Sequence, residues 1–313
     1  MNGPSAGTVF ILLSTYNGAK YLPEQLESFL TQTWPAWTLL WRDDGSSDAT
    51  LAVMEAFAEG KGKGRCERLA EPSGRLGVLE SFLTLLRAAA PRLGAEDCIA
   101  FADQDDVWLP EKLARGMTAL REVTPDTPAL YCARQILVDA ALRRLGLSEP
   151  VPERRGFPAA LTQNVATGCT ILLNRAAARL IAQSRPPASS VHDWWAYLLV
   201  SAAGGRILAD ATPTILYRQH EANTIGLRRS RLARGFAALR RGPAPFMRDF
   251  RAHLQALAEQ AELLSPAAQR DIAFLQQALD GWRLARFKAL RMPGLKRRHW
   301  SEGLLFRLWF LLG

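Results

Sequence analysis

Short apolar runs alternate with segments of helical spacing along the first half of the chain. Short apolar runs cover residues 9–14, 37–42 and 98–102, of which the last is fully apolar, and a weaker one covers 65–70. Between them apolar residues recur at helical spacing, as in 78–90. Strands that are buried on both faces appear as continuous apolar runs. The alternation therefore predicts an α/β fold with a mostly parallel central sheet flanked by helices.

The second half of the chain has a different spacing. We expect strands at 129–138, 167–173 and 206–217, joined by longer links, and a helix that starts near His192. These strands should extend the sheet and frame one side of a ligand site. Two adjacent tryptophans, Trp194 and Trp195, follow in the same helix, and each offers an apolar ring face to a ligand or to the core.

Residues 228–313 are predicted to form a C-terminal helical extension of the domain that spans residues 1–227. Ser265 followed by Pro266 is typical of a helix start, because serine caps the first turn and proline suits its first position. The extension is also basic. It holds 17 Lys/Arg and 6 Asp/Glu, a net charge of +11, whereas the rest holds 22 and 24, a net of −2.

This charge asymmetry limits the class of protein. A uniformly basic chain would indicate nucleic-acid binding, whereas a nearly neutral domain with a basic extension indicates an appended surface-binding element. The four cysteines are scattered, which argues against a zinc site or disulfides and favours a reducing compartment. We see no signal peptide and no apolar stretch long enough to span a membrane, so we expect a cytoplasmic protein.

Polar clusters follow three of the predicted strands, at residues 14–17, 43–46 and 103–106. In parallel sheets the carboxyl ends of the strands meet at one edge, and ligands bind beyond that edge. Residues that are far apart in the sequence are therefore expected to form one rim.

The acidic run at 103–106 has the clearest chemistry. Asp103, Asp105 and Asp106 repel one another, so packing alone does not favour them, and a divalent cation relieves the repulsion. Carboxylate oxygens suit Mg²⁺ or Mn²⁺, which can neutralise a diphosphate and stabilise it as a leaving group. The alternative is a solvated acidic turn that caps a helix starting near Pro110.

Asp44 is a candidate for recognising a nucleobase, because its carboxylate can accept a hydrogen bond from a base N–H. Tyr16 would stack nearby, and Gly18 would leave room for close approach. The alternative is that the Asp-Gly-Ser sequence simply forms a turn and caps a helix.

Asp193 lies at the start of a predicted helix and is a candidate general base, which would deprotonate an acceptor hydroxyl. Helix capping is the alternative for this residue. His220 follows a predicted strand, where a neutral imidazole could join the same metal or simply be structural.

Together these segments resemble the family 2 glycosyltransferases, which have the GT-A fold, and most closely their bacterial rhamnosyltransferase-like branch. The matching text occurs in the family's order between about residues 8 and 227: LLSTYNGAKYLPEQLESFLTQT, WRDDGSSDAT, GVLESF, FADQDDVWLPEK, NVATGCTILLNR, HDWWAYLLVSAAG and LYRQHEANTIG. Any one motif is weak evidence, but the ordered set is strong.

The resemblance implies an inverting, metal-dependent transfer of rhamnose or a similar sugar from a nucleoside-diphosphate sugar, dTDP-rhamnose or a UDP-sugar, to a glycan or lipid-linked acceptor in surface polysaccharide synthesis. It implies roles for residues matched by motif. Ser14, Tyr16 and Asp44 would hold the base and ribose, and Gly77 would lie near the nucleotide. Asp103 and Asp105 would form the DxD pair with Asp106 beside it, and His220 would be a further metal ligand. Thr167 and Gly168 would line the sugar–acceptor pocket, and Asp193 would be the catalytic base.

The chain departs from the family pattern in two places. Ser73, Gly74 and Arg75 stand where relatives often have an asparagine before the Leu-Gly pair, so Arg75 either meets the diphosphate or is solvated. His192 stands where many members have glutamate, and it would only position its neighbour. Neither departure identifies the donor sugar.

The resemblance does not reach residues 228–313, where a basic cluster at 296–298 precedes an apolar final segment rich in leucine and aromatic residues. Such a helix can lie on an anionic membrane surface. The alternatives are packing on the catalytic domain and a dimer contact.

Other functions stay open for the whole chain. They are a non-catalytic glycan- or nucleotide-binding module on the same fold, nucleic-acid binding through the tail, and a nucleotidyltransferase. We expect no nucleic-acid partner, because the tail is rich in leucine and aromatic residues, and no glycine-rich phosphate loop supports a nucleotidyltransferase.

Overall fold

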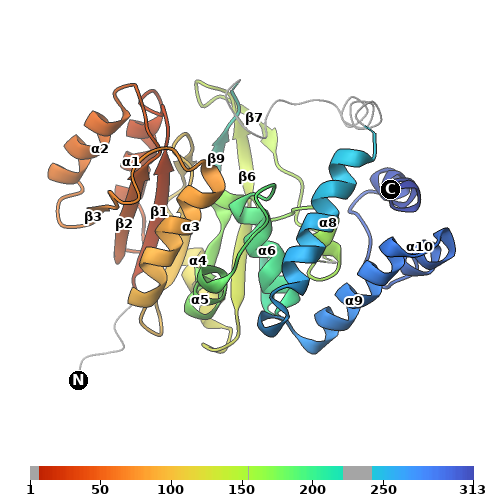
Figure 1. The fold of residues 1–313 in the computed structure, drawn as a ribbon. Coiled ribbons are helices and arrows are strands. Elements are labelled where there is room, and N and C mark those ends of the chain that lie inside the picture. The colour runs from red at the N-terminus through yellow and green to blue at the C-terminus, as the bar shows by residue number, and fades with distance from the viewer. Residues whose placement is uncertain (1–6, 154, 221–241) are drawn as a thin grey trace.

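The computed structural model describes residues 7–153, 155–220 and 242–313. Its centre is a nine-stranded sheet with the order β3-β2-β1-β4-β8-β6-β9-β5, and β7 pairs with β6. Helices cover both faces of the sheet, and the C-terminal helices gather beyond one end of it (Figure 1). The strands are β1 (Val9–Thr15), β2 (Trp37–Asp43), β3 (Cys66–Arg68), β4 (Cys98–Ala102), β5 (Val107–Trp108), β6 (Ala129–Val138), β7 (Arg144–Leu147), β8 (Leu172–Asn174) and β9 (Arg206–Arg218). The helices are α1 (Leu22–Leu30), α2 (Thr50–Glu59), α3 (Val78–Ala89), α4 (Lys112–Arg121), α5 (Arg175–Gln183), α6 (His192–Ala202), α8 (Ala244–Ala258), α9 (Pro266–Asp280), α10 (Arg283–Ala289) and α11 (Trp300–Leu312).

The N-terminal half of the sheet is parallel. β1 pairs in parallel with β2 and β4, and β2 pairs in parallel with β3. Thr15 at the end of β1 is level with Asp43 at the end of β2. Leu13 is level with Ala102 at the end of β4. The three polar clusters therefore begin at one edge, as predicted.

The second half of the sheet is mixed. β8 runs antiparallel between β4 and β6, while β6 and β9 pair in parallel. The strands predicted at 129–138 and 206–217 are confirmed. The strand predicted at 167–173 is replaced at its start by a 3-10 turn, Gly168–Thr170. The hydroxyl of Thr170 donates to the carbonyl of Thr167 at 2.7 Å and closes this turn, which delays the strand.

Apolar clusters fill both faces of the sheet, which explains the short apolar runs. Phe10 and Leu12 of β1 belong to one cluster, whereas Ile11 and Leu13 belong to the other. Leu12 and Leu13 have no exposed surface. Full burial of a leucine side chain contributes about 1.5–3 kcal/mol, so both faces of β1 stabilise the domain.

The C-terminal helices share the first of these clusters. His253 of α8 contacts α6 and the turn before it, because its ring lies 4.7 Å from that of Trp194 and its Nε2 lies 2.9 Å from the hydroxyl of Ser190. Ser265 caps α9, with its side chain accepting from a backbone N–H, so this predicted helix start is confirmed. The predicted boundary at residues 227 and 228 lies outside the described residues. Among the helices described, none is both long and apolar enough to cross a membrane.

Candidate active site

Gln104 joins two of the polar clusters at the sheet edge. Its side chain accepts a hydrogen bond from the backbone N–H of Tyr16 at 2.8 Å and donates one to the carbonyl of Tyr16 at 2.9 Å. The space beside Gly18 is also taken, because a Cβ added there would lie 2.3 Å from the Gln104 side chain. The room that Gly18 provides is therefore used by the protein itself, which corrects our expectation of a close ligand approach there.

Asp44 is buried and already has three protein donors. Its carboxylate accepts from the guanidinium of Arg42 at 2.6 Å and from the backbone N–H groups of Leu76 and Gly77 at 2.7 and 2.9 Å. Gly77 has a φ of 81°, a conformation that favours glycine. The structure thus brings Asp44 and Gly77 together, and Asp44 holds the turn before α3. A carboxylate has about four lone-pair sites, so the three protein donors leave room for one more donor. The predicted hydrogen bond from a nucleobase to Asp44 therefore stays a prediction.

Tyr16 stands at the outer rim with 37% of its surface exposed. The guanidinium carbon of Arg75 lies 4.3 Å from the centre of its ring. Arg75 is therefore not simply solvated, because it covers the ring face on which a base would stack. Ser14 lies deeper, with its hydroxyl 2.7 Å from that of Ser81 in α3.

The acidic run divides into an outer pair and an inner group. In the outer pair, Asp105 Oδ2 lies 2.8 Å from Nε2 of His220, and both side chains are partly exposed, at 21% and 15%. In the inner group, ligand atoms of the partly exposed Asp103 and of the buried Asp106 and Cys169 lie within 4.8 Å of one another. Asp106 has no exposed surface. The residues predicted to bind metal are therefore near one another but differ in access.

Burial sets the electrostatics of the inner group. Loss of solvent raises the pKa of Asp103 to about 7, and repulsion from Asp105 and Asp193 adds to the effect. The pKa of Asp106 is also raised, first by burial and then by Asp105 and Asp103. Within the described part of the chain, Oδ2 of Asp106 has no hydrogen-bond partner. The inner carboxylates thus resist ionisation unless a cation faces them.

Lys112 supplies a positive charge to the inner group. This lysine is fully buried, and its Nζ forms no hydrogen bond with the residues described. Burial lowers the pKa of Lys112 to about 8, whereas Cys169, Asp106 and Asp103 act in the opposite direction. The buried ammonium therefore partly balances the inner carboxylates.

Arg218 holds the acidic run against β9. Its backbone N–H donates to Asp106 Oδ1 at 3.1 Å, and its Nε donates to the carbonyl of Asp105 at 2.8 Å. The same guanidinium forms an ion pair with Glu24 of α1. We did not single out Gln104, Cys169, Lys112 or Arg218 from the sequence, although all four lie within the matched motifs.

Asp193 begins α6 and faces the 3-10 turn. Its Oδ2 accepts from the backbone N–H of Gly168 at 3.0 Å, and its Oδ1 accepts from that of Trp194 at 2.6 Å. Burial raises the pKa of Asp193 to about 6, although the hydrogen bonds oppose the shift. The structure therefore brings Gly168 and the preceding Thr167 next to the candidate base.

His192 and Trp195 are packing residues. The His192 ring stacks on Phe82 at 3.9 Å, and burial lowers its pKa to about 3, so the imidazole is neutral. A Cβ on Gly168 would lie 2.7 Å from His192 Nε2, so this close approach requires glycine. Trp195 has no exposed surface and donates to the hydroxyl of Ser184. Its ring is therefore a core element, which corrects the alternative of a sugar-facing ring.

A parallel half-sheet with an acidic run at its edge, extended by a mixed half that carries a buried carboxylate, is the arrangement expected of the GT-A fold. A family model described as glycosyl transferase family 2 matches residues 10–177. The chain belongs to glycosyl transferase family 2, as the motifs predicted.

Relatives and solved structures agree with this assignment. The chain is 28% identical over 236 residues to the dTDP-rhamnosyl transferase RfbG of Shigella flexneri, which covers 68% of this chain and 73% of that protein. Residues 1–349 of TarS from S. aureus, in complex with UDP-GlcNAc, have a TM-score of 0.55 at 16% identity, with 91% of this chain and 76% of that 1–349 chain covered. The mannosyltransferase PcManGT from Pyrobaculum calidifontis, in complex with GDP-Man and Mn²⁺, has a TM-score of 0.50 at 18% identity, with 97% and 86% covered. Both structures show the same fold, so the predicted GT-A architecture is confirmed.

Proposed function

We propose that this glycosyltransferase is an inverting, metal-dependent enzyme of surface polysaccharide synthesis that transfers rhamnose or a similar sugar. The observation that carries the proposal is the position of the Asp193 carboxylate close to the acidic run. The 3-10 turn links them, because the backbone N–H of Gly168 donates to Asp193 at 3.0 Å and ligand atoms of the next residue, Cys169, lie within 4.8 Å of those of Asp103 and Asp106. Such an arrangement can hold a sugar diphosphate on one side and an acceptor hydroxyl on the other.

The residues of the acidic run fit a hard divalent cation, Mg²⁺ or Mn²⁺. Asp105, Asp103 and His220 offer carboxylate oxygens and an imidazole nitrogen, and Asp105 and His220 stand at the accessible rim. Asp106 lies behind them, and we propose that it supports the ligands from within, because it is buried and bonded to the Arg218 backbone. When bound, the cation would neutralise the diphosphate leaving group.

Asp193 is proposed as the general base. Two backbone N–H groups fix its carboxylate at 3.0 and 2.6 Å, so it is oriented before substrate arrives. With a pKa raised to about 6, it is ionised at neutral pH and still basic enough to take a proton from the acceptor hydroxyl. Thr167 and Gly168 would line the pocket beside it.

The donor would lie along the rim between β1 and β2. Ser14, Tyr16 and Asp44 would hold the base and ribose, and Gly77 would lie next to the nucleotide. Similarity to a dTDP-rhamnosyl transferase supports dTDP-rhamnose, and UDP-sugars are the other donor class. A lipid-linked glycan is the acceptor that we favour, and the basic C-terminal helices would contact the inner face of the cell membrane.

A donor panel tests this function. Purified protein would be incubated with dTDP-rhamnose, UDP-sugars and a soluble glycan acceptor, with and without Mn²⁺, and the products followed by NMR. We expect metal-dependent transfer with inversion at the anomeric carbon. Asp193→Asn should lower kcat by about 10²–10⁴-fold, the usual contribution of a general base.

The control for Asp193→Asn is donor binding, which a thermal-shift assay should find intact. Full transfer by Asp193→Asn would refute its role as base. Unchanged sugar nucleotide with every acceptor would favour a non-catalytic binding module.

A further inference from the structure

The outer faces of α10 and α11 are unusually apolar for a protein surface. Of the eleven large apolar residues that are exposed in the described chain, seven lie between residues 282 and 312. They are Trp282, Leu284, Phe287, Trp300, Leu304, Leu308 and Leu312. Scattered single residues of this kind need no explanation, but a cluster marks an interaction surface.

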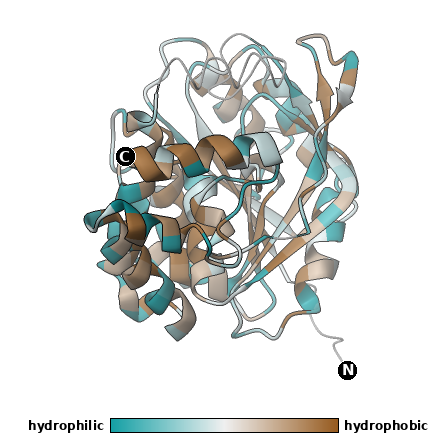
Figure 2. Cartoon of the chain, turned by 90° about the vertical axis from the view of Figure 1, so that its right-hand side faces the viewer, coloured by the Kyte–Doolittle hydropathy of each residue, from teal (hydrophilic) through white to brown (hydrophobic). Residues whose placement is uncertain are grey.

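The residues of α11 form a regular stripe. Trp300, Leu304, Leu308 and Leu312 follow at intervals of one helical turn, and their exposed fractions are 80%, 58%, 49% and 59%. The opposite face of α11 is also apolar and packs inward, as shown by Phe306, whose ring lies 6.0 Å from that of Phe250. Figure 2 shows this helix lying across the surface, largely brown along its length. A helix that is apolar on both faces needs a cover on each.

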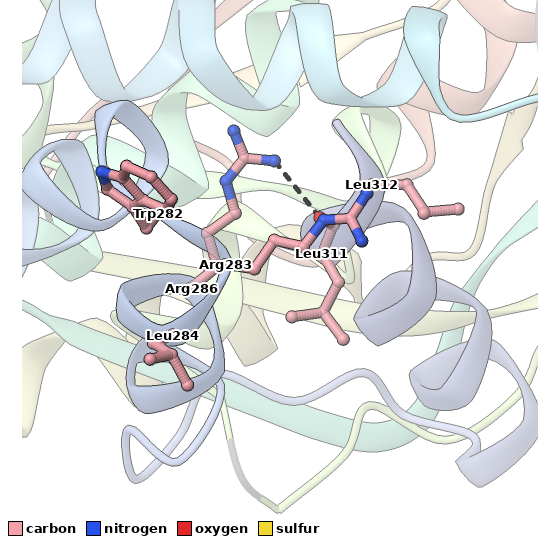
Figure 3. Close-up of a pocket in the computed structure, with 7 residues that line it drawn as sticks. Trp282, Arg283, Leu284, Arg286, Leu311 and Leu312 are labelled. Carbon is pink, nitrogen blue, oxygen red and sulfur yellow. Dashed lines mark hydrogen bonds between the residues drawn. The ribbon is translucent and has the colours of Figure 1, made fainter.

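The two helices present one continuous surface. A hollow of about 480 Å³ lies between the start of α10 and the end of α11, with Trp282 and Leu284 on one side and Leu311 and Leu312 on the other (Figure 3). Arg286 of α10 donates to the carbonyl of Leu311 at 3.3 Å, which ties the helices together. The exposed residues of both helices can therefore contact a single partner.

This surface is strongly basic. Residues 282–313 contain eight Lys/Arg and one acidic residue, a net charge of +7. Five of these cations are exposed and form no ion pair among the described residues: Arg283, Lys288, Arg291, Lys296 and Arg307. The guanidinium of Arg291 lies 4.9 Å from the ring centre of Phe287, so charge and apolar surface alternate closely.

The combination of exposed apolar residues and exposed cations identifies the kind of partner. A second copy of this chain would place one basic surface against another in a symmetric dimer, which electrostatic repulsion opposes. Aromatic and leucine side chains interleaved with Lys and Arg are instead suited to the interface of an anionic bilayer, where the apolar groups enter the lipid and the cations meet headgroups. We propose that the α10–α11 surface docks on an anionic membrane.

The surface is linked to the acceptor side of the site. Arg297, which follows α10, donates to the carbonyl of Thr162 at 2.8 Å, and the backbone N–H of Arg298 donates to Gln163 at 3.1 Å. The side chain of the next residue, Asn164, acts on the carboxylate of Asp193 and lowers its pKa. The inference thus deepens the proposed function, on whose lipid-linked acceptor it rests, by placing the membrane contact beside the acceptor loop.

Vesicle flotation of the full chain tests this surface. We expect binding to vesicles that contain phosphatidylglycerol and little binding to pure phosphatidylcholine vesicles. Combining Trp300→Ser, Leu304→Ser and Leu308→Ser should weaken vesicle binding at least about tenfold, because the exposed stripe loses its apolar area. The matched control is Leu147→Ser on β7, which removes an exposed leucine elsewhere and should float like wild type.

Two further measurements separate the outcomes. The melting temperature should be unchanged in the triple variant, since all three residues point outward, and transfer to a water-soluble acceptor should also be unchanged. Equal flotation by the triple variant, or no flotation of folded wild type, would overturn the membrane surface. A dimer that the triple variant dissociates, without vesicle binding, would assign the surface to a second copy. Loss of transfer by wild type would instead refute the proposed function and leave the flotation result standing.

Discussion

Asp105 and Asp106 are neighbours in the acidic run but have opposite surroundings. Asp105 is partly exposed beside His220 at the rim, with an Nε2–Oδ2 distance of 2.8 Å. Asp106 is fully buried, bonded to the Arg218 backbone and subject to the charge of Lys112. Adjacent carboxylates of one motif therefore differ in access. A ligand can reach Asp105, whereas Asp106 is enclosed by the protein.

Removing the outer carboxylate should have the largest effect on activity. Asp105→Asn takes away an accessible oxygen that we propose as a metal ligand, and a bound metal would contribute several kcal/mol of charge stabilisation. We expect kcat/KM to fall about 10³-fold, equivalent to about 4 kcal/mol. Mn²⁺ titration followed by electron paramagnetic resonance should show weaker binding.

Asp106→Asn is the contrasting variant for this measurement. It keeps an acceptor for the Arg218 backbone N–H, and we expect a much smaller loss of Mn²⁺ affinity. Equal loss of Mn²⁺ affinity in both variants would mean that the division into outer and inner carboxylates is wrong.

Removing the inner cation should mainly lower stability. Lys112→Met leaves buried carboxylates without their positive neighbour, a change that commonly costs about 3–5 kcal/mol. Asp103 and Asp106 can take up a proton instead, since burial raises the pKa of both, so we expect a loss of about 2 kcal/mol. Urea unfolding would measure the loss, which should grow as pH rises.

Lys61→Met is the control for Lys112→Met. Lys61 pairs with Glu27 at 2.7 Å, but both side chains are exposed, at 66% and 54%. Its loss should change the free energy of unfolding by less than about 1 kcal/mol. If the two lysine variants unfold alike, Lys112 does not balance the inner group.

The sequence predicted the outer features of the site better than the inner ones. Apolar runs revealed β1, β2 and β4, and register then placed Asp44, Tyr16 and Asp103 at one edge. Lys112 was not predicted because a lysine at a helix start is normally solvated, whereas this one is buried and its Nζ lies 4.3 Å from the centre of the Trp108 ring. Cys169 was missed as well, since only the unforeseen turn at 168–170 brings it to Asp103.

The sequence also did not predict which protein side chains would occupy the space and hydrogen-bonding groups that a ligand could use. Asp44 and Gly18 suggested an open nucleotide site, but the side chain of Arg42 bonds Asp44 and the side chain of Gln104 fills the space beside Gly18. Motif spacing fixes which residues meet at an edge. It does not predict which atoms of these residues already form hydrogen bonds or contacts within the protein.

The acid limb of the pH–rate profile tests whether burial controls the base opposite the acidic run. Asp193 is buried like the inner group, and burial raises its pKa to about 6. A general base must be ionised, so kcat/KM should be constant at neutral pH and fall about tenfold for each pH unit below about 6. Each such step corresponds to about 1.4 kcal/mol, the smallest of the effects predicted for the site.

Stability should change with pH in the opposite direction. The pKa of Asp193 is higher in the folded chain than its ordinary value of 3.8, so the folded state binds more protons between about pH 4 and 6. Unfolding free energy should therefore decrease as pH rises through this window, and Asp193→Asn should reduce that decrease. Two results together would contradict this prediction: an acid limb near pH 4 in the wild-type rate, and an unchanged pH dependence of unfolding in Asp193→Asn. They would show that Asp193 is solvated during catalysis and belongs with the outer pair.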